Sequence, residues 1–368
     1  MRKLLVLAAL GLSLTGCSKE AQDKPRLQSI EEKSEDKKNS NEPKKHEETI
    51  YEYFDTITAF IAYTDSDEDF EKYSNILKDE LSKYHKLYNS YDEFEGVNNF
   101  LTINQNAGKE PVKVDPEIID LIEYSKKMYE LTDGKINIAM GSLLGLWHDY
   151  RQVSLEEPEK AAIPKEDELK EASKHSDIEK IIVDKEKSTV FIEDPNIKID
   201  IGAIGKGYAT QKISQRLEEE GLTNAILSVG GDDVLIGENP SREDGLWKIA
   251  IKNPDLADKE NPYVSIVGLI DTSVVTSGDY QRFFEVDGKK YHHIIDPATM
   301  YPSTKWKSVS VAMDDIALAD TISTYLFIVD LEEGKEIAEK MGAKVLWVDT
   351  DGKEYRTDDW EELEERAK

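Results

Sequence analysis

The chain has 368 residues, of which 76 are Asp or Glu and 47 are Lys or Arg, so its formal net charge is −29. This acidic balance argues against nucleic-acid binding, because phosphate backbones require a cationic protein surface. Cys17 is the only cysteine, which excludes disulfides within the chain and metal sites built from several thiolates.

The first 16 residues have the composition of a secretion signal: two basic residues precede an apolar run over residues 4–14 that is too short to span a bilayer. Residues 14–17, Leu-Thr-Gly-Cys, resemble the lipobox of bacterial lipoproteins. We therefore predict that residues 1–16 are removed and that Cys17 is lipidated, which would anchor the protein in the cell membrane, facing the outside. A leftover cysteine in a non-lipid signal is the alternative.

Residues 17–48 are predicted to be a disordered, charged tether. Beyond Cys17 they are mostly Lys, Glu, Asp, Gln, Asn and Ser, with almost no large apolar side chain. Such a segment cannot bury enough surface to offset the entropy of ordering it. Residues 49–368 have the length and apolar content for one large or two small folded domains.

Residue periodicity predicts a mixture of helices and strands in this folded part. The predicted helices are residues 69–87, 116–131, 165–175, a helix that follows residues 200–207 and ends at Gly221, and 316–328. The predicted strands are residues 51–63, 181–183, 189–192, 198–201, 225–229, 234–236, 247–251, 264–269, 282–286 and 345–348, while 140–147 is apolar without a clear period. The elements follow no regular βαβ order, so we predict an α+β fold.

The segment from Asp200 to Ala209, DIGAIGKGYA, places three glycines and a lysine at the start of the central helix. Glycines allow a tight turn and close approach of a ligand, and the free N–H groups of a helix start favour an anion. Lys206 would add a full positive charge. The spacing differs from that of a P-loop. The alternative is an ordinary glycine-rich turn between a strand and a helix.

Three polar residues share one face of the predicted helix 316–328. Asp320, Ser323 and Thr324 stand at positions i, i+3 and i+4. A carboxylate and two hydroxyls form a set of hard oxygen donors that suits magnesium. A buried capping or packing cluster is the alternative.

Three further polar segments are candidates for a site. In residues 291–299, His292, His293 and Asp296 surround an apolar pair; a histidine could act as a base, or both could be solvated residues at a strand end. Residues 271–280 are interpreted as a small polar turn able to hold phosphate oxygens. The Gly-Gly-Asp turn at residues 230–232 is interpreted as structural.

Taken together, five motifs resemble those of one family. DIGAIGKGYA, SVGGD, VVTSGDY, HHIIDPATMYP and ADTIST occur in the order and approximate spacing of the ApbE flavin transferases, which are FAD:protein FMN transferases. The resemblance covers about residues 49–348. It implies a single large α+β domain of the ApbE or T-fold-like type.

The resemblance also implies an activity, namely magnesium-dependent transfer of FMN from FAD to a threonine hydroxyl of partner flavoproteins in membrane electron transfer, with release of AMP. A surface lipoprotein that only binds flavin, or a FAD pyrophosphatase without a protein acceptor, is the alternative. Motif matching places the metal on the Ala203 carbonyl, Asp320 and Thr324, with Ser323 adjacent.

The same matching implies which residues contact FAD and which accept a proton. The general base would be His293 or Asp279. Met300 stands where the family usually has glycine. The implied FAD contacts are Phe54, Ala139, Met140, Gly141, Asp200, Lys206, Thr276, His293 and Ile294.

Overall fold

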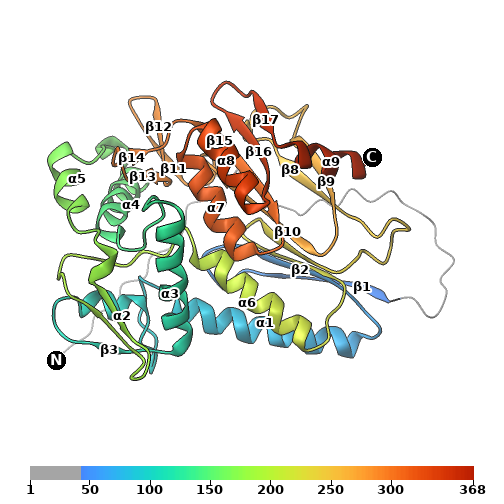
Figure 1. Ribbon diagram of the computed structural model, residues 1–368, viewed down its shortest axis with the longest axis horizontal. Coiled ribbons are helices and arrows are strands. Elements are labelled where there is room, and N and C mark those ends of the chain that lie inside the picture. The colour runs from blue at the N-terminus through green and yellow to red at the C-terminus, as the bar shows by residue number, and fades with distance from the viewer. Residues whose placement is uncertain (1–42) are drawn as a thin grey trace, which may run out of the picture.

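An eight-stranded sheet forms the centre of the computed structural model, which describes residues 43–368 (Figure 1). Cys17 and the predicted signal lie outside the described residues. Each neighbouring pair of strands in this sheet is antiparallel. In spatial order the strands are β1 (Lys44–Ile50), β2 (Thr58–Thr64), β6 (Ala225–Val229), β7 (Asp232–Ile236), β10 (Thr272–Gly278), β15 (Trp306–Met313), β16 (Lys344–Asp349) and β17 (Glu354–Arg356).

Successive residues of the central strands are buried on opposite faces of the sheet, as the alternation of side chains in a strand requires. Phe60 belongs to the large apolar core on the face that the long helices cover. Its neighbour Ile61 belongs to a smaller core with Trp247 and Trp360 on the other face. That second face is covered by β8 (Trp247–Lys252), β9 (Tyr263–Leu269) and α9 (Asp358–Arg366).

Helices from several parts of the chain contribute buried residues to the large core, and four of them pack against strands of the central sheet. In α6, Ile213 and Leu217 are fully buried, and α7 is buried on nearly all sides. The α6 helix lies beside both α1 and α7, as Figure 1 also shows. The four helices are α1 (Asp67–Leu87), α6 (Gly205–Glu219), α7 (Ile316–Ile328) and α8 (Leu331–Met341).

The remaining helices gather at one end of the molecule, on the left of Figure 1. They are α2 (Phe100–Gln105), α3 (Pro116–Leu131), α4 (Gly141–Glu156) and α5 (Glu166–Ser173), with the short helices η1 (Pro158–Lys160) and η2 (Ile178–Lys180). A small sheet has the order β3 (Val112–Lys113), β5 (Thr189–Ile192), β4 (Ile181–Asp184), and two hairpins pair β11 (Phe283–Val286) with β12 (Lys289–His292) and β13 (Ile295–Asp296) with β14 (Tyr301–Pro302).

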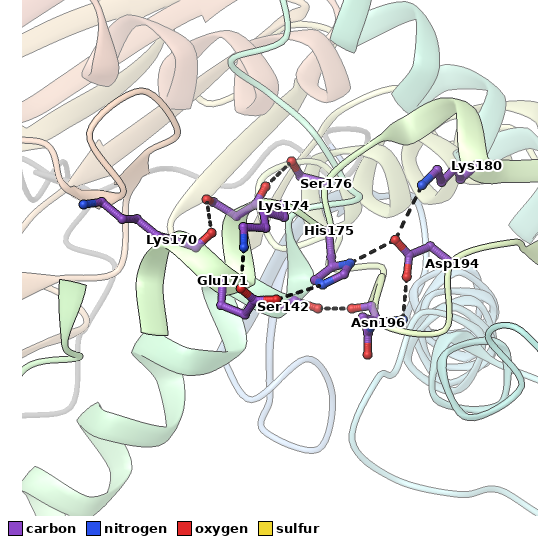
Figure 2. A network of polar contacts seen from close by, with 10 residues as sticks. Ser142, Lys170, Glu171, Lys174, His175, Ser176, Lys180, Asp194 and Asn196 are labelled. Carbon is purple, nitrogen blue, oxygen red and sulfur yellow. Dashed lines mark hydrogen bonds and ion pairs between the residues drawn. The ribbon is translucent and has the colours of Figure 1, made fainter. Parts of the chain in front are cut away.

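A polar network ties α5 to the segment that leads into the glycine-rich motif (Figure 2). His175 Nδ1 lies 2.9 Å from Asp194 Oδ2, and Lys180 approaches the same carboxylate at 3.6 Å. The Ser142 hydroxyl donates to the Asn196 carbonyl, which joins the start of α4 to this segment. The network therefore fixes the chain just before Asp200.

The predicted α+β class is confirmed, and so are the five predicted helices. The helix predicted over residues 116–131 matches α3, and that over 316–328 matches α7. No helix within residues 43–368 is both long and apolar enough to cross a membrane.

Several predicted boundaries were wrong. The predicted tether ends at residue 48, but β1 begins at Lys44, because its residues pair with β2 along their whole length. The strand predicted over 51–63 is a loop followed by β2. Residues 198–201 form only an isolated bridge, from Lys198 to Met140.

Two segments have another structure than the sequence predicted. The supposed polar turn at residues 271–280 is largely strand β10, whose small hydroxyl side chains fit between β15 and α7. Residues 141–147 lie in helix α4. Met140 is the residue that precedes the helix, and within residues 141–147 the buried apolar side chains are Leu143 and Trp147, which stand four residues apart.

Candidate functional site

The start of α6 and the middle of α7 touch at Gly207 and Asp320. The backbone N–H of Gly207 donates to Asp320 Oδ2 at 2.7 Å. A Cβ on Gly207 would lie 2.4 Å from the Cβ of Asp320, so no side chain fits between the two helices here. The glycine is therefore needed for close helix packing, which holds the Asp320 carboxylate in one position.

Lys206 and three aspartates form what we call the acidic cluster (Lys206, Asp232, Asp233, Asp320). The Lys206 ammonium contacts Asp232 Oδ2 and lies 3.5 Å from Asp320 Oδ1. Burial raises the pKa of Asp233 to about 6, although the nearby Lys206 opposes this shift. Burial also lowers the pKa of Lys206. The predicted anion-binding lysine is thus already paired with the protein's own carboxylates.

Asp232 and Asp233 were missed as site residues, because the Gly-Gly-Asp segment was interpreted as a structural turn. Its two glycines form the turn between β6 and β7. Asp232 and Asp233 are the first residues of β7 and are only 3% and 7% exposed. Two consecutive carboxylates beside two buried strands are costly unless they are paired, and this is the signal that could have revealed them.

Three hydroxyls lie beside Asp320 and form the hydroxyl cluster (Ser277, Ser323, Thr324). Ser277 Oγ reaches from β10 to within 2.8 Å of Ser323 Oγ and 3.4 Å of Thr324 Oγ1. Ser323 in turn donates to the Asp320 carbonyl at 2.9 Å. The preceding Thr276, predicted as a FAD contact, bonds Ser310 on β15 at 2.7 Å.

The Ala203 carbonyl is available at the start of α6. In a regular helix it would accept from the N–H of Gly207, but that N–H donates to Asp320. Within residues 43–368 no other backbone N–H bonds to this carbonyl. Asp200 holds the preceding turn, since its Oδ1 accepts from the N–H of Gly202 at 2.8 Å, and burial raises its pKa.

The oxygens predicted to bind a metal fit magnesium by their chemistry. They comprise one carboxylate, two hydroxyls and a carbonyl without a backbone partner, all hard donors. The described part of the chain holds no group of three or more His, Cys, Asp or Glu side chains placed for a metal. The metal assignment therefore depends on Asp320 and neutral oxygens, with water and phosphate completing the shell.

The two histidines of the HHIIDP motif have different surroundings. His292 is 6% exposed; its Nε2–H donates to the Ser303 carbonyl at 2.6 Å, and its Nδ1 accepts from Ile294 N–H. His293 is exposed, and desolvation by the surrounding protein and repulsion by Arg282 hold its pKa well below the ordinary 6.5. His292 thus holds the loop, while His293 is free to contact a ligand.

Asp279, the other predicted base, follows β10 directly. Its Oδ1 is buried without a hydrogen-bond partner, and its Oδ2 lies 3.5 Å from Lys290 Nζ. Nearby, Met300 takes the left-handed conformation at φ 66°. This explains the glycine usual at this position, because only glycine adopts such a φ without cost. The Met300 carbonyl accepts from Trp147 Nε1 at 2.9 Å, which helps to hold the loop.

The other predicted FAD contacts come from two segments. Ala139 and Met140 are buried, and a Cβ on Gly141 would lie 2.4 Å from the Lys198 carbonyl oxygen, so this stretch can offer a ligand mainly its backbone. Phe54 has φ 57°, donates its N–H to His85 Nδ1 at 3.2 Å, and meets the His85 ring edge-on. Its loop lies against the β6–β7 turn, next to the acidic cluster.

Curated proteins named FAD:protein FMN transferase are similar to this chain. One from Klebsiella pneumoniae (strain 342) is 30% identical over 262 residues, which are 69% of this chain and 76% of that protein. One from Haemophilus influenzae is 28% identical over 358 residues, which are 95% of this chain and 93% of that protein.

Solved structures show the same fold. The crystal structure of the ApbE protein from Thermotoga maritima MSB8 matches with a TM-score of 0.73 and 28% identity, over 87% of this chain and 99% of that chain. Flavin transferase ApbE from Vibrio cholerae matches with a TM-score of 0.72 over the same shares, at 24% identity, which supports the fold alone. The model of the ApbE family matches residues 54–347. As its motifs predicted, the chain belongs to the ApbE family.

Proposed function

We propose that this protein transfers FMN from FAD to a threonine hydroxyl of partner flavoproteins, with magnesium, and releases AMP. The names of its curated relatives support flavin transfer. The observation that carries the finer proposal is the arrangement around Asp320. The buried Asp320 carboxylate is fixed by Gly207, the hydroxyl cluster bonds to the main-chain carbonyl of the same residue, and the Ala203 carbonyl, to which Gly207 would donate in a regular helix, has no backbone partner.

The transfer breaks the phosphoanhydride bond of FAD and forms a phosphoester bond to the threonine. The threonine Oγ attacks the phosphorus of the FMN half and loses its proton to a base, while the bond from this phosphorus to the bridging oxygen breaks and AMP leaves with that oxygen. A magnesium ion held by Asp320, Thr324 and the Ala203 carbonyl would neutralise charge on the phosphates. Fixed side chains suit this chemistry, because positioning and electrostatics supply most of the catalysis.

His293 and Asp279 are the two candidates for the base. His293 has an exposed ring with a nitrogen that can accept a proton, but its lowered pKa makes it a weaker base than an ordinary histidine. Asp279 offers a buried carboxylate oxygen without a hydrogen-bond partner. Single substitutions followed by pH–rate profiles distinguish them, because only loss of the base removes the corresponding limb of the profile.

We also propose that the protein is a lipoprotein, held at the outer face of the cell membrane through Cys17. The support is the sequence of residues 1–17, with its short apolar run and lipobox pattern. The charged residues that follow would then keep the domain at a distance from the bilayer and within reach of membrane-bound acceptor flavoproteins.

The decisive experiment incubates the purified protein with FAD, magnesium and candidate acceptor proteins. Mass spectrometry of the acceptor should show covalently added FMN, and chromatography should show an equal amount of AMP. EDTA should prevent both. AMP released at the same rate without any acceptor would instead indicate a pyrophosphatase, and FAD bound without AMP release would indicate a flavin-binding lipoprotein.

A further inference from the structure

Two arginines near the site have no acidic partner. No carboxylate lies within 4.0 Å of Arg151 or Arg282 anywhere in residues 43–368, whereas Arg216, Arg242 and Arg356 all form ion pairs; Arg366, in α9, shares this lack of an acidic partner but lies on the other face of the sheet from the long helices. In a chain with a net charge of −29, arginines without a carboxylate partner are unexpected. Their isolation therefore suggests that they serve an anion from outside the chain.

The fold brings the two arginines together from distant parts of the sequence. Trp147 on α4 stacks on Tyr291 of β12, with ring centroids 5.9 Å apart, and this packing fixes α4 against the β11–β12 hairpin. Arg151 lies one turn after Trp147, and Arg282 directly precedes β11. Trp147 also meets Phe284 of β11, with ring centroids 6.4 Å apart, which brings the start of that strand and Arg282 towards α4. In agreement with this packing, burial and the repulsion of Arg282 lower the pKa of Arg151.

Arg151 and Arg282, with His148 and Tyr91, form what we call the arginine cluster. Arg151 Nη2 lies 3.1 Å from His148 Nδ1, and the His148 ring stacks on Tyr91 at 5.3 Å. Tyr91 is 63% exposed, so its ring remains available to a planar ligand. Phe283 pairs with His292 across the β11–β12 hairpin, so the neighbouring Arg282 lies beside His293, one of the candidate bases. The charge of Arg282 also lowers the pKa values of Lys206 and His293.

The acidic cluster cannot hold phosphate unaided. Its one ammonium already contacts Asp232 and Asp320, and Asp233 lies close enough for their charges to interact. The sum of these charges is negative when all are ionised, and it repels an anion. Positive charge without a carboxylate partner is therefore found at Arg151 and Arg282, and not at Lys206.

We propose that Arg151 and Arg282 bind the diphosphate of the dinucleotide substrate, and that Lys206 is the counter-ion of the acidic cluster. This inference rests on the proposed function. Guanidinium groups match phosphate oxygens with paired hydrogen bonds, and an exposed aromatic ring beside them suits a nucleotide better than an acidic peptide. An acidic peptide is the competing ligand, and the experiment below distinguishes it from the dinucleotide.

The test compares FAD with riboflavin, which lacks phosphate, by titration calorimetry of the full protein in EDTA. The variants are Arg151→Gln, Arg282→Gln and their combination. Arg216→Gln is the matched control, since Arg216 is a surface arginine paired with Glu219 and Glu220. Each of the first two should weaken FAD binding about tenfold or more, because a charge-assisted hydrogen bond is lost. The affinity of these variants for riboflavin should not change, and the affinity of Arg216→Gln for FAD should not change either.

Three results would overturn the inference: unchanged FAD affinity in the double variant, an equal loss for riboflavin, or equal affinity of the native protein for FAD and riboflavin. Unchanged FAD affinity combined with weaker binding of an Asp-rich peptide would identify the peptide as the ligand. Failure of the proposed function is a separate result, in which the native protein binds neither flavin. The inference about Arg151 and Arg282 would also be refuted if Lys206→Met alone abolished the preference for FAD over riboflavin.

Discussion

Replacing Gly207 with alanine should force α6 and α7 apart and destabilise the protein. The added Cβ would lie 2.4 Å from the Cβ of Asp320 and 2.8 Å from the Ile316 carbonyl oxygen. Neither atom is the end of a flexible side chain, so the helices themselves must move. That movement would also lengthen the 2.7 Å hydrogen bond from the Gly207 N–H to Asp320.

Three contributions determine the size of the effect. Overpacking costs about 1–3 kcal/mol, and a weakened hydrogen bond to a charged group costs up to about 1.5–3 kcal/mol. The higher helix propensity of alanine offsets roughly 1 kcal/mol. The free energy of unfolding should therefore fall by about 1.5–5 kcal/mol, and FMN transfer should fall with it because Asp320 is displaced.

Urea unfolding followed by circular dichroism measures this loss, and Gly145→Ala is the matched control. Gly145 also lies within a helix, but a Cβ there would meet nothing within 4 Å. Its replacement should be neutral or stabilise the protein by up to about 1 kcal/mol. Equal stability of the two alanine variants would refute the reasoning about the contact between α6 and α7.

Four further predictions concern single residues. Asp320→Asn should keep the fold but slow FMN transfer by about 100-fold or more at saturating magnesium, measured by acceptor mass; normal turnover would contradict the metal assignment. Lys206→Met should lower the free energy of unfolding by about 1–3 kcal/mol in urea titrations, because Asp232 loses the ammonium that it contacts. Asp233→Asn should raise the free energy of unfolding at pH 8 by up to about 3 kcal/mol and change it little near pH 4. The reason is that burial raises the pKa of Asp233 from 3.8 to about 6, so proton binding stabilises the folded state at low pH and this stabilisation is lost as the pH rises through that interval. Cys17→Ser should release the protein or block its processing, and membrane retention of the processed variant in cell fractionation would count against a lipid anchor.

Local patterns in the sequence were sufficient for the helices that carry the site. In α6, apolar residues at four-residue spacing predicted the buried face, and Asp320 with Ser323 and Thr324 was expected on one face of α7. These predictions held because helical periodicity is a local property. The proximity of Gly207 to Asp320 is different, since 113 residues separate them. Only the family motifs linked the two.

The charges around the site could not be predicted in the same way. Lys206 was interpreted as an anion-binding group, because its partner Asp232 lies on another element and was taken as part of a turn. Arg151 and Arg282 carry no motif, and α4 was not predicted as a helix at all. Whether a charged side chain is paired depends on tertiary contacts, which residue spacing does not encode.

The pairing of Lys206 gives the glycine-rich motif a second purpose. The helix start that was expected to receive an external anion already receives one from the chain, the Asp320 carboxylate at the Gly207 N–H. A carboxylate placed at the positive end of a helix is stabilised in its charged form. The turn therefore gives the Asp320 carboxylate a fixed backbone partner inside the protein, and the carboxylates around Lys206 outnumber its single positive charge, which favours a cation over a phosphate beside them. The close approach that the glycine permits thus links the packing of two helices to the chemistry of the site.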